Sequence, residues 1–250
     1  MNPRATQCVA IVLRRTDWRE SSRIVTLLSR EYGRRSFLAK GAHRAKSPFL
    51  GALDTFHVLD VRVRVRDGRG LQILDGARVL HGNRVFRTDG VRYGLATHLA
   101  EAVQVAMPEG RADPELFDVF RGGLALFRMA AAESLPVIAT ALLLRTCRTL
   151  GVLADLERCA DTGEPLPDRG RVGFVAGEGG FVRQSSRGRS VDASLPRLAT
   201  SILETTGRAL EQRCDDPKSV RNLLVLVHEL LWTQLGEEPR TSLPRAILGS

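Results

Sequence analysis

Five cations lie close together in the segment GRRSFLAKGAHRAKSPF, which spans residues 33–49 and contains no acidic residue. Arginine forks and lysine ammonium groups neutralise phosphate oxygens, so a basic cluster without acids predicts a phosphate-binding site. Gly41, Ala42 and Ala45 have small side chains or none, so a sugar–phosphate backbone could approach the main chain closely. The alternative is a solvated loop whose charges protect an edge strand. The candidate phosphate-binding residues are Arg34, Arg35, Lys40, Arg44 and Lys46.

The excess positive charge of the chain belongs entirely to its first third. Residues 1–82 contain 16 Lys and Arg against 7 Asp and Glu, whereas the remaining 21 basic and 21 acidic residues cancel, leaving the net charge of +9. Such an asymmetry indicates that the first third contacts a polyanion. Nucleic acid fits better than an anionic membrane, because no basic amphipathic helix occurs in this third. The remaining alternative is an arginine-rich protein that binds no polyanion.

The elements that would position these cations are five predicted strands. In 56–66, Val61, Val63 and Val65 alternate with arginines, the period-2 pattern of a half-buried antiparallel strand. A strong turn signal follows at 67–70, and Gly33 suits a hairpin turn. The five predicted strands are 8–14, 22–30, 34–41, 56–66 and 71–80.

Five short strands with a longer connection after the third match the size and strand count of an OB-fold barrel. Another small barrel of the SH3-like type, or an irregular sheet, has the same strand count. OB-folds bind single-stranded nucleic acid in a basic groove, and exposed rings often add base stacking. Trp18, in the first loop, is a weak stacking candidate, whereas Phe37 and Phe56 fit the core. Further basic candidates are Arg14, Arg15 and Arg19, with Arg62, Arg64 and Arg66 on the polar face of the fourth strand.

From residue 84 the pattern changes to helical periodicity. Predicted helices cover 91–107, 113–131, 134–151, 194–212 and 215–236, with Asp113 and Asp216 as N-caps and Gly236 closing the last. The last helix is apolar nearly all round, which predicts a central position. Between the third and fourth helices, an insertion at about 156–190 is rich in Gly, Pro and charge and contains a predicted hairpin. We therefore expect an α+β protein with a barrel domain at 1–82 and a helical domain at 83–250.

Signals for catalysis are weak throughout the chain. There is no phosphate-cradling GxxxxGK[ST] or GxGxxG motif, and the five histidines are scattered. The four cysteines are far apart in sequence, which favours free thiols in a reducing compartment. The amino terminus lacks the layout of a signal peptide, and no apolar run is long enough for a membrane span. We expect a cytoplasmic protein that is not an enzyme and binds no cofactor.

Several segments resemble the bacterial DNA repair protein family RecO. The most specific is AKGAHRAKS at 39–47, within the longer similar stretch from VLRRTDW to GALDTF at 12–56. The similarity continues, more loosely, through LFD (116–118), LRTCRTLG (144–151), CADTGEP (159–165), GG (179–180) and PKSVRNL (217–223).

This resemblance implies a non-catalytic recombination mediator at the nucleoid. Such proteins have an OB-fold domain, a helical domain and a zinc-finger-like insertion. They bind single- and double-stranded DNA and anneal complementary strands. They also engage the C-terminal tail of single-strand-binding protein through the helical domain, and with RecR they help to load RecA onto coated strands.

One departure from the family concerns the metal. Many members carry two CxxC pairs in the insertion, but here the first pair is Cys159-Ala-Asp-Thr162 and the second position holds Arg183-Gln-Ser-Ser186. One thiolate cannot hold a structural zinc ion, so we predict no metal site. For the acidic tail of single-strand-binding protein, Arg145 and Arg148 are candidate contacts or else merely solvated cations. An RNA-binding OB module with a helical adaptor, and a purely protein-binding scaffold, remain open alternatives.

Overall fold

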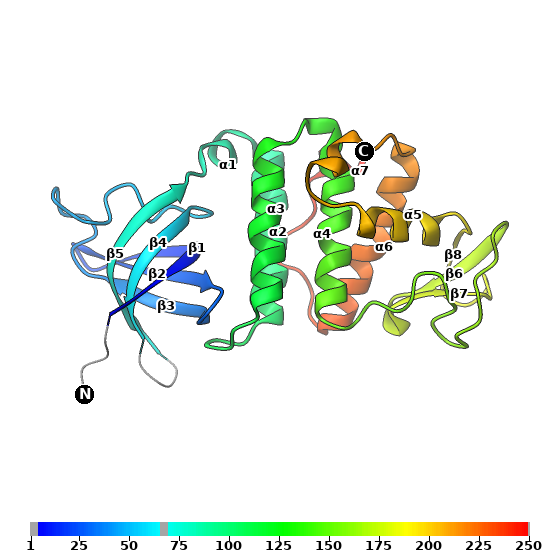
Figure 1. The fold of residues 1–250 in the computed structure, drawn as a ribbon, viewed down its shortest axis with the longest axis horizontal. Coiled ribbons are helices and arrows are strands. Elements are labelled where there is room, and N and C mark those ends of the chain that lie inside the picture. The colour runs from blue at the N-terminus through cyan, green and yellow to red at the C-terminus, as the bar shows by residue number, and fades with distance from the viewer. Residues whose placement is uncertain (1–4, 66–69, 250) are drawn as a thin grey trace. The chain divides into compact units, whose positions relative to one another are not determined.

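The computed structural model describes residues 5–65 and 70–249 (Figure 1). By its internal contacts the chain forms two compact units. One comprises the residues up to Tyr93 together with Met107–Leu124, and the other comprises Gly94–Ala106 together with Ala125 and the residues after it. The division into domains at residues 82 and 83 stays a prediction.

The first unit contains a closed five-stranded barrel. Its strands are β1 (Thr6–Trp18), β2 (Ser22–Ser29), β3 (Gly33–Ala39), β4 (Val58–Arg64) and β5 (Gln72–His81). They follow the order β1-β2-β3-β5-β4, and β4 pairs with β1 to close the barrel. All neighbours are antiparallel except β3 and β5, which pair in parallel from Phe37↔Gln72 to Ala39↔Leu74. The predicted five-stranded OB-fold is confirmed.

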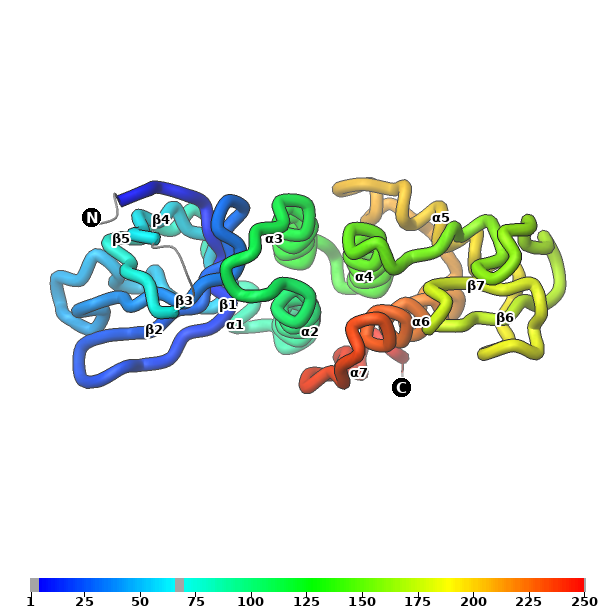
Figure 2. The backbone as a smooth tube through the Cα atoms, turned by 90° about the horizontal axis from the view of Figure 1, so that it is seen from below, coloured from blue at the N-terminus to red at the C-terminus, as the bar shows by residue number. Residues whose placement is uncertain are grey.

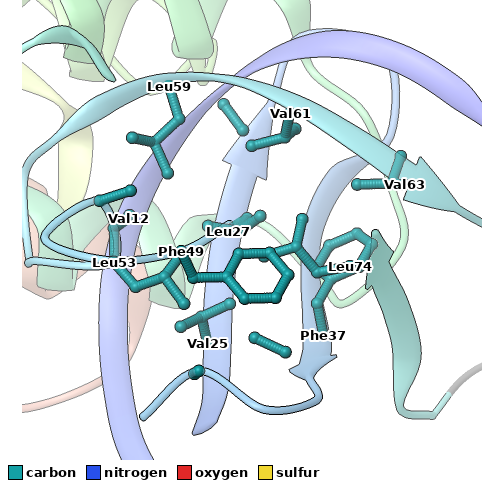
Figure 3. Close-up of a cluster of buried hydrophobic side chains, with 14 of the residues drawn as sticks. Val12, Val25, Leu27, Phe37, Phe49, Leu53, Leu59, Val61, Val63 and Leu74 are labelled. Atoms are coloured by element: carbon teal, nitrogen blue, oxygen red, sulfur yellow. The ribbon is translucent and has the colours of Figure 1, made fainter. Parts of the chain in front are cut away.

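Alternation along the strands fills the barrel with apolar side chains. Val61 and Val63 are buried while Arg62 between them is exposed, as the period-2 pattern predicts. Figure 3 shows the resulting cluster, in which Phe37 of β3 and Phe49 lie beside valines and leucines from the other four strands. Phe56 is also buried, as predicted, but its ring packs edge-to-face on Phe86, 5.5 Å between centroids. Arg66 and most of the predicted 67–70 turn lie outside the described residues.

Helices begin after the barrel, as predicted. They are α1 (Arg84–Thr88), α2 (Gly90–Ala106), α3 (Pro114–Met129), α4 (Leu135–Thr149), α5 (Leu195–Glu204), α6 (Pro217–Leu235) and α7 (Arg245–Leu248). Short 3₁₀ turns are η1 (Ala132–Ser134), η2 (Ala176–Glu178) and η3 (Gly207–Gln212). The predicted caps are confirmed at Asp113 and Asp216, whose carboxylates accept the N–H groups of Leu116 (2.9 Å) and Ser219 (2.8 Å). Among the described helices, none is long and apolar enough to cross a membrane.

One helix prediction is wrong. The expected continuous helix at 194–212 ends at Glu204, and a 3₁₀ turn follows from Gly207. Two β-branched residues and a glycine in a row weaken helix propensity at this point. Thr205 adopts an extended conformation (φ −71°, ψ 125°), and Gly207 has φ +57°, a left-handed value that favours glycine.

Helix α6 lies at the centre of the second unit, side by side with α4 in both views (Figures 1 and 2). Eight of its residues are buried, from Val220 to Trp232, which confirms its predicted central position. The insertion forms a small sheet in the order β7-β6-β8, built from β6 (Arg171–Val175), β7 (Gly180–Val182) and β8 (Arg189–Asp192). The predicted hairpin corresponds to β6 and β7, whereas β8 was not predicted.

Candidate nucleic-acid interface

Lys40, Arg44 and Lys46 lie on the turns that follow β3. The N–H of Arg44 donates to the carbonyl of Gly41 (3.1 Å), and the N–H of Ser47 donates to that of Arg44 (2.9 Å), so the segment folds back on itself. All three cationic side chains are exposed, and within the described residues none has an ion pair or a hydrogen bond. Gly41, at φ +70°, makes the turn that a side chain would strain.

The β1–β2 turn lies against this basic segment. The N–H of His43 donates to the carbonyl of Ser21 (3.1 Å), which ties the two loops together. The β1–β2 turn presents an exposed Trp18 ring (46% exposed) and Arg19, a non-glycine residue at φ +55°. The structure therefore brings Trp18 and Arg19 to the same end of the barrel as Lys40, Arg44 and Lys46.

The acids of this turn are Glu20, which lies within it and is exposed, and Asp17, whose carboxylate is already occupied. Its Oδ1 accepts from Arg23 Nε (2.7 Å) and lies 3.1 Å from His43 Nε2. The hydrogen bond from Arg23 is the main cause of the lowered pKa of Asp17, so the carboxylate stays ionised and bound to these partners. Arg19 has no recorded carboxylate partner in the part of the chain that the structure describes.

Arg14 and Arg15 follow a bulge in β1 and differ in their partners. The bulge lies between Val12 and Arg14 in the pairing of β1 with β2. Arg15 Nη1 lies 2.6 Å from Asp54 Oδ1, whereas Arg14 is exposed, and among residues 5–65 and 70–249 it has no ion pair. Arg14 can therefore extend the basic surface, while Arg15 would have to share its charge with Asp54.

Arg34 and Arg35 lie at the other end of β3, about 20 Å from Lys40 at ~3.3 Å per residue. Arg34 Nε donates to the carbonyl of Met107 (3.2 Å), and its own carbonyl accepts from Gly110 N–H (2.8 Å). Arg35 Nε donates to the Tyr32 carbonyl (3.3 Å), and its guanidinium lies against Gly110, where a Cβ would be 3.2 Å from Nη2.

The contacts of Gly33 complete this packing. A Cβ at Gly33, which has φ +63°, would lie 2.0 Å from the carbonyl oxygen of Arg111, so only glycine fits there. The predicted single cluster at 33–49 is thus two groups. One is exposed after β3, and the other is packed on the loop between α2 and α3. No local sequence signal indicates the second contact, because it joins residues more than seventy positions apart.

The arginines of β4 are divided in the same way. Arg64 Nε lies 2.6 Å from Asp75 Oδ2, while Arg62 is exposed above Gly76. Arg62 can contribute to a basic surface, and Arg64 is largely neutralised by its partner.

Of the two candidate partner residues in the helical unit, only Arg148 is exposed. The Arg145 guanidinium is half-buried and donates to the carbonyl of Thr205. Burial, together with the like charge of Arg148, lowers the pKa of Arg145. Arg145 therefore holds the chain after α5 in place and is poorly placed to receive a ligand.

Arginines connect the parts of the insertion around Cys159. Arg187 donates to the carboxylates of Asp161 and Glu178, joining the Cys159 turn to η2. Arg183 Nη1 donates to the carbonyl of Pro165 (3.0 Å). Within the described residues no group of three or more His, Cys, Asp or Glu could hold a metal ion. Sequence reasoning missed this network, because its members are scattered along the insertion.

Cys159 keeps a polar environment although it stands alone. Burial raises the pKa of its thiol, but hydrogen bonds from the Thr162 side chain and from backbone N–H groups outweigh burial and lower the pKa. One of these donors is the Arg183 N–H, 3.4 Å from Sγ.

Sequence reasoning also missed a groove of about 330 Å³ between the insertion and α6. Arg171, Arg189 and Asp192 line one side of it, and Asn222 and Val225 of α6 line the other. Arg189 Nη2 lies 3.5 Å from Glu229, and Arg171 donates to Ser190. The guanidinium groups of Arg171 and Arg189 could bind acidic side chains of a peptide, and Val225 could contact an apolar side chain of the same peptide.

Comparison with known proteins agrees with this architecture. Residues 1–83 match the family described as recombination protein O N terminal, and residues 87–244 match recombination protein O C terminal. A DNA repair protein RecO of Anaeromyxobacter dehalogenans strain 2CP-C is 37% identical over 172 residues, which are 69% of this chain and 66% of that protein. This match thus spans just under two thirds of the relative's length.

Other relatives extend the match. The DNA repair protein RecO of Chlorobium limicola is 26% identical over 243 residues, 92% of this chain and 93% of the relative. That of Geobacter metallireducens is 36% identical over 163 residues, 65% of each chain. With both family regions matched in order along an OB-fold barrel and a helical region, the chain belongs to the recombination protein O (RecO) family of DNA repair proteins.

Proposed function

We propose that this protein is a non-enzymatic recombination mediator. It binds single- and double-stranded DNA, anneals complementary strands and, together with RecR, helps to load RecA onto strands coated by single-strand-binding protein. The observation that carries the DNA-binding part is the group of exposed cations without recorded carboxylate partners at one end of the barrel. This group, the basic end, comprises Arg19, Lys40, Arg44 and Lys46, and the exposed Arg14 lies further along β1, opposite Thr26.

The basic end is suited to a phosphate backbone rather than to base recognition. Its cations have no internal counterion to displace, so each phosphate contact would release counterions from DNA at little internal cost. Trp18 is the one exposed ring among the described residues of this end and offers a face for base stacking. Binding would therefore depend strongly on salt and weakly on sequence. Arg15, Arg34 and Arg35 would contribute less, because each already contacts groups within its own unit.

For the acidic tail of single-strand-binding protein, we favour the groove between β8 and α6 over Arg145. Arg189 and Arg171 line an open groove with Val225 beside them, whereas Arg145 is bound to the Thr205 carbonyl. Arg148 is exposed and remains a second contact. An acidic peptide would compete with Glu229 for Arg189, so Arg189→Glu should abolish peptide binding and Arg148→Glu should weaken it less. Fluorescence anisotropy of a labelled tail peptide measures both.

The decisive test is the annealing rate of two complementary DNA strands, each precoated with the cognate single-strand-binding protein, with and without this protein. Clear acceleration is the expected result. Acceleration of naked strands alone would support the basic end and contradict the partner contact. No acceleration of either by a folded protein would overturn the proposal.

The same preparation distinguishes DNA from RNA as the ligand. Matched DNA and RNA strands of one sequence should show tighter binding of DNA. Tighter binding of RNA would favour the RNA-binding alternative, and loss of all nucleic-acid binding at low salt would favour a protein scaffold.

A further inference from the structure

A second feature of the barrel unit is a pocket of about 130 Å³ formed by β1, the segment before β4, and the start of the helical region. Arg15 and Arg87 line it together with Asp54, Phe86 and Tyr93. Phe86 is buried at 3% exposure, whereas the Tyr93 ring is 46% exposed. The pocket therefore has an accessible aromatic ring next to charged groups.

The charges of this pocket do not cancel. Asp54 is shared by two arginines, with Arg15 Nη1 2.6 Å from Oδ1 and Arg87 Nη1 3.5 Å from Oδ2. Arg87 makes the longer contact and is 71% exposed, so its guanidinium is the more available of the two. One carboxylate between two guanidinium groups leaves one positive charge for an anionic ligand.

The backbone beside the pocket is held in an unfavourable conformation. Phe56 has φ +66°, a left-handed value that costs a bulky non-glycine residue energy. Its ring is held by Phe86 (5.5 Å) and by Tyr93 (5.8 Å), and Asn83 donates to the carbonyl of Thr55. Strain of this kind concentrates at ligand sites, where the surroundings must fix the geometry.

We propose that this pocket binds one unpaired nucleotide of a single DNA strand, with its base against Tyr93 and its phosphate on Arg87. Any nucleic-acid base can stack on an aromatic ring such as that of Tyr93, and a guanidinium such as that of Arg87 binds a phosphate. A ring and a guanidinium in one pocket therefore fit a nucleotide better than an inorganic anion or an apolar ligand. The inference rests on the proposed DNA binding and names a site within it that is distinct from the basic end.

A variant with a neutral side chain at position 54 separates a ligand site from a structural ion pair. Asp54→Asn removes the carboxylate that competes for Arg87, so single-stranded DNA should bind more tightly although the internal ion pairs are lost. Arg87→Ala should lower the salt slope of binding by about 0.7, the contribution of one phosphate contact on a single strand. If the ion pairs serve only folding, Asp54→Asn would lower stability without increasing affinity.

The ring is tested with a thymidine oligonucleotide and with thymidine monophosphate. Tyr93→Leu should weaken oligonucleotide binding at least about fivefold, the loss of one stacked base, while Tyr93→Phe should bind like the original protein. The monophosphate should bind weakly and compete poorly, because the pocket holds one nucleotide of a strand that the basic end also binds. Tight binding of the free monophosphate would instead indicate a nucleotide-binding site and overturn the proposal as stated.

Failure of this inference is distinguishable from failure of the proposed function. If the original protein binds the oligonucleotide, Arg44→Glu weakens it, and the Tyr93, Arg87 and Asp54 variants all behave like the original protein, the pocket is not a DNA site. If the folded original protein binds no DNA, both proposals fall.

Discussion

Two basic segments of this protein differ in whether their cationic side chains have hydrogen-bond or ion-pair partners within the fold. In the insertion, five arginines have acceptors within the fold: Arg158, Arg171, Arg183, Arg187 and Arg189. In the basic end, the described residues supply no acceptor for Lys40, Arg44 or Lys46. Both segments are rich in basic residues, but the insertion at 156–190 also contains five acidic residues, whereas 33–49 contains none. The difference teaches that cation density alone does not predict a phosphate-binding surface, because neighbouring acids can take up the charge, and that cations without an internal counterion are the more available to a ligand.

The largest effect on DNA binding is expected when the charges of the basic end are reversed. Arg44→Glu together with Lys46→Glu should weaken binding of single-stranded DNA about 100-fold at low salt, because two cations become anions beside the phosphates. The slope of log affinity against log salt should fall by roughly 1.4, since each lost phosphate contact removes about 0.7. Filter binding or anisotropy across a salt series measures both quantities.

Two controls sharpen this contrast. Arg208→Glu reverses an exposed charge on η3 and should leave the slope unchanged. Arg34→Ala removes a cation whose Nε is bound to the Met107 carbonyl, so it should lower stability while changing the slope little. An equal loss of slope in all three variants would show that net charge, rather than the basic end, governs binding.

The second unit contains a pair of stacked histidines, His98 and His228, whose side chains titrate differently from exposed ones. His98 is 1% exposed, its Nδ1 lies 3.0 Å from Thr241 Oγ1, and its Nε2 accepts from Trp232 Nε1 (3.2 Å). The His228 ring stacks on it at 4.8 Å. Burial and the neighbouring His228 lower the pKa of His98 to about 4, against an opposing influence of Glu101. Burial also lowers the pKa of His228.

These shifts make the protein less stable in mild acid. Between the unfolded pKa of about 6.5 and the folded value of about 4, the unfolded chain binds a proton that the native chain does not. The free energy of unfolding therefore decreases as the pH is lowered through this window. His98 alone should cost about 2 kcal/mol between pH 7.5 and pH 5. Urea unfolding at the two pH values measures the loss.

The matched variants for this prediction are His98→Gln and the exposed His81→Gln. The first should be less stable at neutral pH but should show a smaller loss on acidification. The second should retain the full pH dependence. A pH dependence unchanged by His98→Gln would assign the titration to other groups.

A smaller effect is expected where the insertion arginines are removed. Arg187→Ala should destabilise the insertion by about 1 kcal/mol, because the half-buried Glu178 loses its cation while solvent screens part of the interaction. Limited proteolysis should then cut near residues 159–190 sooner, with the DNA salt slope unchanged. Arg197→Ala breaks a more exposed pair with Asp168 and should change stability by less than about 0.5 kcal/mol. Equal proteolysis of both variants would contradict a stabilising role for Arg187.

Local patterns predicted most of the fold, and distant contacts account for what they missed. The alternation of Val61, Arg62 and Val63 and the cap at Asp216 depend on neighbours within a few residues, so the sequence alone predicts them. The contact of Arg34 with Met107 and the bridge from Arg187 to Asp161 join residues far apart in the chain, and no short motif encodes them. Because the contact of Arg34 with Met107 is not visible in the sequence, the sequence alone predicts one cluster for Arg34 and Lys40.

The smallest expected effect concerns metal. Removal of divalent ions with a chelator should leave the thermal midpoint of the protein unchanged, because Cys159 is the one thiol in the described insertion, and Arg187 and Arg183 already connect its parts by hydrogen bonds. Added zinc should not raise the midpoint either, since a ligand that binds only the native state would stabilise it. The matched control is Cys159→Ser, which removes the thiol that a metal would need but keeps a small acceptor for the Arg183 N–H. A midpoint that falls with chelator, recovers with zinc and loses this response in Cys159→Ser would show that the insertion still binds metal. In that case a bound metal ion, and not the hydrogen bonds of Arg183 and Arg187 alone, would hold the insertion together.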